Sequence, residues 1–85
     1  MRKTTSDRLK EIMELKGLKQ VDILEKAKPI SEKLGVRLGK NDLSQYVSGK
    51  VEPGQDKLTV LSRALGVSEV WLMGYDIDTE NKKQE

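Results

Sequence analysis

Apolar side chains recur along this sequence at intervals of three and four residues, and no segment alternates between apolar and polar residues as a strand would. The spacing predicts an all-α fold. We expect five helices, over about residues 6–16, 20–34, 40–48, 55–65 and 68–73. Glycine takes up the left-handed conformation that ends a helix without steric cost, so the first four helices are predicted to stop at glycines. These are Gly17, Gly35, Gly49 and Gly66.

The first two predicted helices each have one apolar face. Leu9, Ile12 and Met13 share a face of the first helix, and Ser6 is its predicted N-cap. In the second helix, the inner stripe is expected to consist of Val21, Leu24, Ala27 and Ile30.

Pro29 lies within the second helical pattern. Proline lacks the N–H that a helix interior requires, so we expect it either to kink this helix or to open a new short one. Ser31 to Leu34 should continue as helix. Val36 and Leu38 belong to a connecting segment that is expected to dip into the core.

The third predicted helix has an unusual polar face. Leu43, Tyr46 and Val47 stand at i, i+3 and i+4 and should face the core. The opposite face then carries short, mostly uncharged polar groups, whereas an ordinary surface helix favours Glu and Lys. Asn and Gln can bind adenine in the major groove, but small polar residues can equally well just end a short helix. The outward residues are Lys40, Asn41, Ser44, Gln45 and Ser48.

The remaining helices close the predicted domain. Leu58, Leu61 and Leu65 should point inward from the fourth helix, and Ser68 is the predicted N-cap of the fifth, where Trp71 is expected in the core. We expect one domain over residues 1–75. Residues 76–85 are polar and charged, and are predicted to be a disordered tail or linker.

Composition excludes several classes of function. The 85 residues include no Cys and no His, which removes thiolate metal sites, the commonest metal ligand and the commonest general base. No nucleophile and base stand at a catalytic spacing, so we expect no enzyme, no catalytic residue, no metal and no cofactor. No apolar run is long enough for a membrane span or a signal peptide, so a cytoplasmic protein is expected.

The charge of the chain is unevenly distributed. The net charge is +2. Residues 1–50 hold 12 Lys/Arg and 7 Asp/Glu, a net of +5, and residues 51–85 hold 4 and 7, a net of −3. A basic first part suits a polyanion such as DNA. Charge alone, however, favours an ordinary surface of mixed charges.

Several segments together resemble one family of regulators. The segment Leu-Ser-Gln-Tyr-Val-Ser-Gly-Lys over 43–50 and the segment Trp-Leu-Met-Gly-Tyr over 71–75 are the most informative. With Lys-Gly-Leu-Lys-Gln over 16–20 and Ala-Leu-Gly-Val over 64–67, they resemble the XRE family of Cro/CI-like helix-turn-helix regulators. The likeness covers about residues 6–75. It is greatest to CI-type repressors of temperate phages and prophages of Gram-positive bacteria.

The resemblance implies a five-helix, lambda-repressor-like DNA-binding domain whose third helix lies in the major groove. It implies a transcriptional repressor, or the N-terminal DNA-binding domain of one, that binds double-stranded DNA at a palindromic operator as a homodimer. A C-terminal oligomerisation domain or an antirepressor would be further partners outside this sequence. The implied base contacts are Lys40, Asn41, Ser44 and Gln45, and the implied backbone contacts are Lys19, Gln20, Lys50 and Gln55.

This chain departs from the family pattern in and around the second helix. The stretch from Gln20 to Lys40 is several residues longer than the tight family turn allows, so the region between helices 2 and 3 is expected to be lengthened. Lys19 and Gly39 stand where relatives have Ser or Thr as N-caps. A second interpretation is an antitoxin or other protein-interaction module on the same fold. An apolar surface around Trp71 beyond the needs of the core would favour it.

Overall fold

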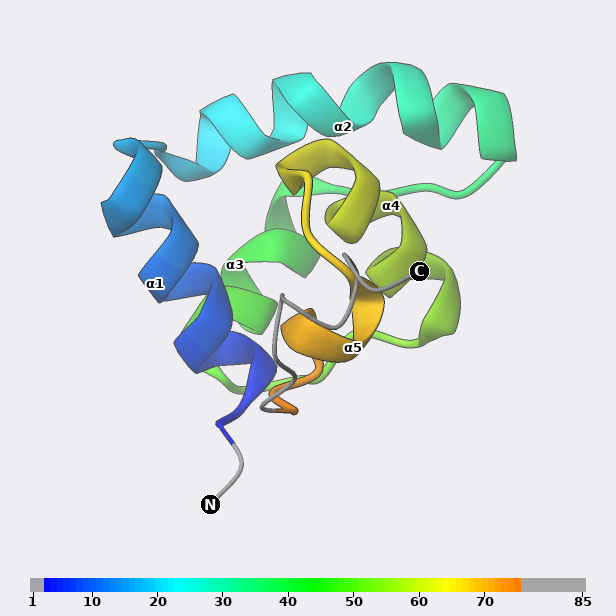
Figure 1. Ribbon diagram of the computed structural model, residues 1–85. Helices are drawn as coiled ribbons and strands as arrows, with labels where there is room; N and C mark the ends of the chain where they lie inside the picture. The colour runs from blue at the N-terminus through cyan, green and yellow to red at the C-terminus, as the bar shows by residue number, and fades with distance from the viewer. Residues whose placement is uncertain (1–2, 76–85) are drawn as a thin grey trace, which may run out of the picture.

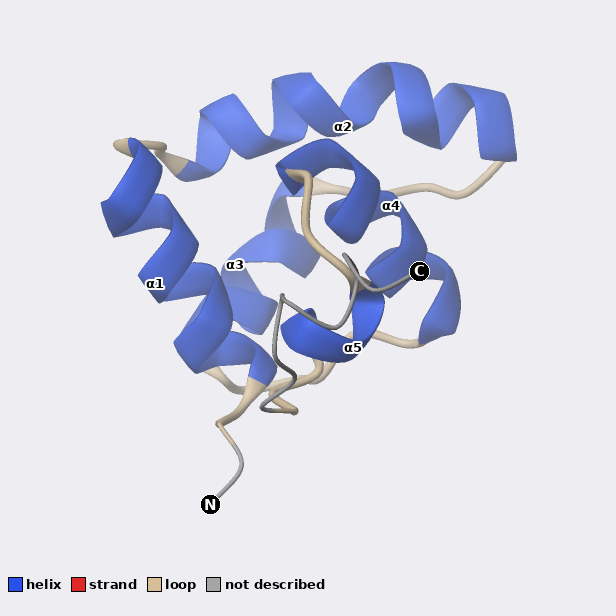
Figure 2. Ribbon diagram, viewed as in Figure 1, coloured by secondary structure: helices blue, strands red, loops and turns tan. Residues whose placement is uncertain are grey.

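The computed structural model describes residues 3–75 and folds this part of the chain entirely into helices and their connections. Figures 1 and 2 show α2 lying across one end of the molecule, with α4 beneath it and α1 and α3 side by side. Among the described residues there are five α-helices and no strand, so the predicted all-α fold is confirmed. The helices are α1 (Thr5–Lys16), α2 (Gln20–Leu34), α3 (Lys40–Ser48), α4 (Gln55–Leu65) and α5 (Glu69–Leu72).

The core is aliphatic and draws side chains from every helix. α4 packs mainly against α2, while α3 packs against both α1 and α2, so α3 is held from two directions. Each fully buried leucine or isoleucine contributes about 1.5–3 kcal/mol relative to an exposed one. The largest fully buried side chains are Leu9, Ile23, Leu43, Val60, Leu61, Leu65 and Leu72.

The predicted helix ends are confirmed. α1, α2, α3 and α4 each end at the expected glycine, and each of these glycines has a positive φ. α5 begins after Ser68, whose hydroxyl accepts a hydrogen bond from the backbone N–H of Trp71 at 2.9 Å. The predicted inward positions of α4, Leu58, Leu61 and Leu65, are all buried.

The predicted N-cap of α1 was wrong. Thr4, not Ser6, caps the helix: its hydroxyl accepts from the N–H of Asp7 at 3.1 Å, and the Asp7 carboxylate accepts from the N–H of Thr4 at 3.1 Å. This reciprocal capping box satisfies two donors at once. Ser6 lies inside α1, where its hydroxyl donates to the carbonyl of Val47 at 2.6 Å and ties α1 to α3.

The predicted inner stripe of α2 was also partly wrong. Ile23 and Ala27 are buried, whereas Val21 is 56% exposed and Leu24 is only partly buried. Val21 and Ile23 begin two overlapping apolar stripes, and the predicted stripe is rotated by part of a turn from the buried one. Packing against α4 selects the stripe that contains Ile23 and Ala27.

Pro29 does not open a new helix, so that one of its two predicted outcomes was wrong, while the kink stays a prediction. α2 runs without interruption from Gln20 to Leu34 with Pro29 inside it. Pro29 cannot donate to the carbonyl of Glu25, but both residues are exposed, so water can satisfy that carbonyl.

A five-residue connection over 35–39 replaces the tight turn between α2 and α3. The stretch from Gln20 to Lys40 is mostly helix, because α2 spans 15 residues. Leu38 packs against the core as predicted, and Val36 is partly buried.

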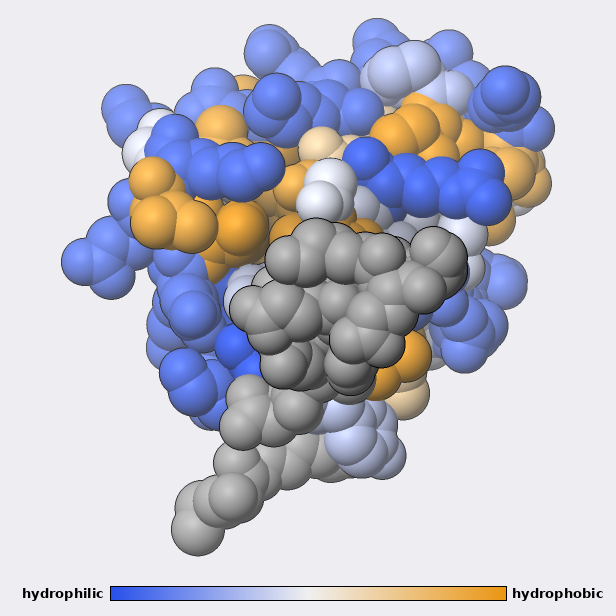
Figure 3. Space-filling model, viewed as in Figure 1, coloured by the Kyte–Doolittle hydropathy of each residue, from blue (hydrophilic) through white to orange (hydrophobic). Residues whose placement is uncertain are grey.

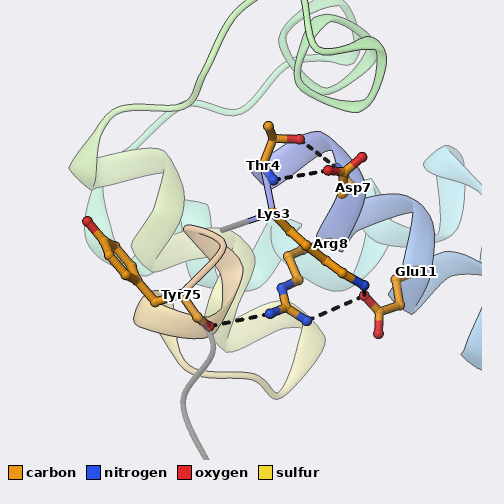
Figure 4. A network of polar contacts seen from close by, with 6 residues as sticks. All are labelled: Lys3, Thr4, Asp7, Arg8, Glu11 and Tyr75. Atoms are coloured by element: carbon orange, nitrogen blue, oxygen red, sulfur yellow. Dashed lines mark hydrogen bonds and ion pairs between the residues drawn. The ribbon is translucent and has the colours of Figure 1, made fainter. Parts of the chain in front are cut away.

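Arg8 is buried to 5% exposure and joins α1 to the end of the described chain. Its guanidinium lies 4.4 Å from the ring centroid of Trp71, donates to the carbonyl of Tyr75 at 3.4 Å and pairs with Glu11 at 3.4 Å (Figure 4). A desolvated cation–π contact contributes about 2 kcal/mol. The face of Trp71 is therefore occupied within the domain. The predicted tail, 76–85, lies outside the described residues.

The capping box gives a pH-dependent prediction. The hydrogen bonds from Thr4 to the Asp7 carboxylate lower the pKa of Asp7 below its ordinary value. A lowered folded-state pKa stabilises the fold above the unfolded value of about 3.9, and this contribution is lost as the pH falls through the folded pKa. Asp7→Asn should therefore lower the free energy of unfolding at pH 7 and have progressively less effect toward pH of about 2.

Thr4→Ala should cost about 1 kcal/mol at pH 7, while Thr4→Ser, which keeps the accepting hydroxyl, should cost much less. Urea denaturation of the three variants and the parent across this pH range measures both effects. A difference between Asp7→Asn and the parent that stayed constant down to the acid limit would contradict the capping role of Asp7.

Candidate nucleic-acid interface

The rotation of α3 about its own axis is fixed by two buried side chains. Leu43 is 0% exposed and Tyr46 is 6% exposed, and both belong to the core cluster. With those positions inward, the opposite side of α3 faces solvent. All four residues predicted to contact bases are exposed there: Lys40, Asn41, Ser44 and Gln45.

The start of α3 is held by Asp42 rather than by a side chain at the N-cap position. The backbone N–H of Gly39 donates to Asp42 Oδ2 at 3.0 Å, and the N–H of Leu43 donates to the carbonyl of Gly39 at 3.1 Å. A carboxylate in the first turn also suits the positive end of the helix dipole. Asp42 is partly buried and engaged with Gly39, so its negative charge is directed toward the connection instead of the outward face.

The end of α3 uses Ser48, which the sequence pattern had placed on the polar face. Ser48 Oγ donates to the carbonyl of Gln45 at 3.1 Å and accepts from the N–H of Lys50 at 3.4 Å. Gly49 has a φ of 85°, and a Cβ at this position would lie 3.5 Å from Ser6. Ser48 thus stabilises the helix end, which is the alternative that the sequence had left open for this polar face.

Tyr46 contributes to packing and not to acid–base chemistry. Burial raises the pKa of its phenol above the ordinary value, and the neighbouring charge of Asp42 adds to this. The phenol therefore stays neutral at physiological pH.

The start of α2 has no hydroxyl cap, and an aspartate holds it in the same way as at the start of α3. The N–H of Lys19 donates to Asp22 Oδ2 at 2.8 Å, and the side chain of Lys19 is exposed. Gln20, the first residue of α2, is partly buried. Its backbone N–H has no acceptor within the helix, as at every helix start.

Of the two predicted DNA-backbone contacts that follow α3, Lys50 has a free side chain and Gln55 does not. Lys50 is exposed in the loop that follows α3. Gln55, by contrast, donates from Nε2 to Glu69 Oε1 at 2.6 Å, and Thr59 donates to Oε2 of the same carboxylate at 2.9 Å. The side chain of Gln55 is therefore directed toward α5. Its backbone N–H, at the first position of α4, remains without a partner in the helix.

A recurring aspartate at the third helical position is the feature that the sequence analysis missed. Asp7, Asp22 and Asp42 each accept from the backbone N–H at the N-cap three residues earlier. The spacing is visible in the sequence and would have identified Thr4 as the cap of α1. It also explains why Lys19 and Gly39 can occupy cap positions without a hydroxyl.

A family model described as helix-turn-helix matches residues 9–72, which covers α2, α3 and their connection. The chain belongs to the XRE-type helix-turn-helix family. This family consists of DNA-binding transcription regulators and is not a family of enzymes, so the chain is a DNA-binding regulator. No curated protein is significantly similar to the chain.

The helix-turn-helix unit of this chain consists of α2, the connection over 35–39 and α3. Over the residues that the structure describes, no group of three or more acidic residues gathers at a distance suited to a metal ion. Within the same residues, no helix combines the length and apolar character needed to cross a bilayer.

Proposed function

We propose that this helix-turn-helix protein is a sequence-specific transcriptional repressor, or the DNA-binding domain of one, that reads a palindromic operator with α3 in the major groove. The observation that supports it is the exposed face of α3. It presents four adjacent polar side chains while Leu43 and Tyr46 anchor the opposite face in the core. A B-DNA major groove is wide enough to admit one α-helix presented in this way.

The proposed base contacts follow from the hydrogen-bonding groups on α3. The amides of Asn41 and Gln45 each combine a donor with an acceptor, which suits N6 and N7 of adenine. Ser44 can donate or accept, and Lys40 can donate to guanine O6 or N7. Lys40 is the first residue of α3, where an approaching phosphate is also within reach of a lysine.

The proposed backbone contacts lie on either side of α3 in the sequence. Lys19 and Gln20 stand at the start of α2, and Lys50 follows the end of α3. For Gln55 we propose contact through the backbone N–H, because its side chain is held by Glu69. Backbone N–H groups at helix starts suit phosphate because the helix dipole is positive there.

We propose a CI-like phage-type regulator that acts in the cytoplasm and binds its operator as a homodimer without a metal or cofactor. The exposed apolar residues at the α5 end of the domain, Val70 and Tyr75, are the proposed contact between copies. Leu72, between them in the sequence, is fully buried and belongs to the core. Trp71 itself is partly buried and its ring stacks on Arg8, so the antitoxin alternative would have to use the same exposed residues, Val70 and Tyr75.

Selection of bound duplexes from a random DNA pool tests the function directly. A regulator of this kind should yield a consensus of two inverted half-sites. Its affinity for that consensus should fall with rising salt, at a slope of about −0.9 in log–log form for each phosphate contacted. Recovery of no consensus, together with no binding at low salt, would refute the proposal.

Gln45 and Lys50 should have distinguishable roles in binding. Gln45→Ala should cost about 1–3 kcal/mol on the selected site and relax the base preference at one position of each half-site. Lys50→Ala should weaken all sequences about equally and reduce the salt slope by about one unit. Anisotropy titrations of both variants against the selected duplex and its single-base variants measure these effects. If Gln45→Ala weakened every duplex equally, α3 would not read bases through this side chain.

Pairing of two copies should depend on DNA. Val70→Asp should abolish cooperative filling of the full operator but leave affinity for an isolated half-site nearly unchanged, because Val70 is exposed and lies on α5, away from α3 in the sequence. Sedimentation of the parent protein should show a monomer at low micromolar concentration in the absence of DNA. Unchanged cooperativity in Val70→Asp would place the contact elsewhere.

A further inference from the structure

The positive charge of this chain is concentrated in the segment that lengthens the helix-turn-helix. Residues 26–40 contain five Lys/Arg and one Asp/Glu, a net of +4. Residues 1–50 as a whole have a net of +5, so the other residues in that range contribute only +1. Most of the excess that suits a polyanion therefore lies in α2 from Lys26 onward, at Arg37 in the connection and at Lys40, the first residue of α3.

Part of this charge lines an open groove of about 650 Å³ between the second half of α2 and the connection over 35–39. Lys28, Arg37 and Lys40 line it together with a single carboxylate, Glu32, and with the aliphatic side chain of Leu38. Figure 3 shows hydrophilic residues along the outer side of α2, with apolar side chains between it and the rest of the molecule. An apolar floor supports the aliphatic stems of long basic side chains and leaves their charged ends at the rim.

The cations of the groove are not neutralised within the domain. In the described range 3–75, both ion pairs involve Glu11 of α1, and neither includes Lys28, Arg37 or Lys40. Lys28, Arg37 and Lys40 are all exposed. Three unneutralised cations beside one carboxylate favour an anionic ligand.

Lys40 connects this groove to the proposed DNA-reading surface. It lines the groove and is also the first residue of α3. A duplex seated on the outward face of α3 would carry a phosphate every few ångströms past this point. We propose that Arg37 and Lys28 bind DNA backbone phosphates next to each half-site, so that the lengthened α2 and its connection form an additional DNA-backbone contact. This inference rests on the proposed function of α3.

Arg37 is the residue expected to matter most. Its guanidinium can donate two parallel hydrogen bonds to one phosphate, whereas a lysine acts as a point charge. Arg37 and Lys28 lie outside α3, so we do not expect either of them to contact a base. Their contribution should therefore be independent of DNA sequence and sensitive to salt.

The test measures the salt dependence of binding to the selected operator duplex for the full chain. Arg37→Ala should reduce the log–log salt slope by about 0.9 and weaken the consensus and its single-base variants by the same factor. Adding Lys28→Ala should remove a similar further amount. Arg37→Lys should restore the slope while binding more weakly than the parent, because it keeps the charge and loses the paired hydrogen bonds.

Arg63→Ala is the matched control, since Arg63 is exposed in the last turn of α4, at the opposite end of that helix from Gln55. It removes the same charge and should leave the slope unchanged. Thermal melting establishes that each variant is folded. Ethylation interference should show a phosphate position outside the half-site that matters for the parent and not for Arg37→Ala.

The outcomes separate the two proposals. If the parent binds its operator and Arg37→Ala and Lys28→Ala both keep the parental slope, the groove makes no DNA contact and this inference is wrong, while the function of α3 stands. The same holds if Arg63→Ala lowers the slope as much as Arg37→Ala, since the effect would then be one of net charge alone. A parent that binds no duplex refutes both.

Discussion

The burial of Leu43 and Tyr46 is the constraint on which the proposed DNA-binding surface depends. α3 has only nine residues and is too short to be stable by itself, so its existence and its rotation both come from packing against α1 and α2. With these two side chains inside, the exposed positions of the helix are determined. Ser6 and Asp42 then fix its two ends through hydrogen bonds to Val47 and Gly39. A polar face of weak helix formers is tolerable because tertiary contacts, not propensity, stabilise the helix.

The lengthened helix-turn-helix has a structural cost and a structural consequence. A tight turn fixes the angle between two helices locally, whereas a longer connection leaves that angle to tertiary contacts. Here those contacts come from Leu38 in the connection and from Ile23 and Ala27 beneath α2. The consequence is that the second half of α2 extends beyond what the packing of α3 requires. Its outward side chains are then free to carry charge: from Lys26 to the end of α2 the net charge is +2, and Arg37 and Lys40 beyond it add +2 more.

The parts of the fold that the sequence predicts well are those in which one rule is sufficient. In α3 and α4 a single apolar stripe predicts most of the buried residues, although Val60 is also fully buried and Val47 only partly so. In α2 two stripes overlap, and only the approach of α4 selects the one with Ile23 and Ala27 over the one with Val21. Periodicity is a local property of the chain and does not contain that information. The effect of Pro29 likewise depends on tertiary structure, because it is set by whether the carbonyl that loses its N–H donor faces water.

In the candidate site too, features set by local sequence could be predicted, and features set by tertiary contacts could not. Outward positions on α3 could be predicted, because they follow from the positions that must be buried. The engagement of Gln55 with Glu69 could not, because these residues are brought together only when α5 folds over α4. Ser48 is a third case. Its hydroxyl could either face outward or bind the backbone at the helix end, and beside Gly49 it donates to the carbonyl of Gln45.

Under the proposed function, specificity and affinity are carried by different parts of this small domain. The face of α3 has few formal charges, and in the proposed complex its amides and hydroxyl would discriminate between bases through directional hydrogen bonds, which contribute little attraction at long range. Attraction must come from cations, and these lie mostly outside α3, in α2, in the connection and after Gly49. Separating the two reduces competition between them, because a lysine-rich reading face would bind any duplex strongly and distinguish sequences poorly. Placing the charge on an extension of α2 adds attraction without changing the residues that read the bases.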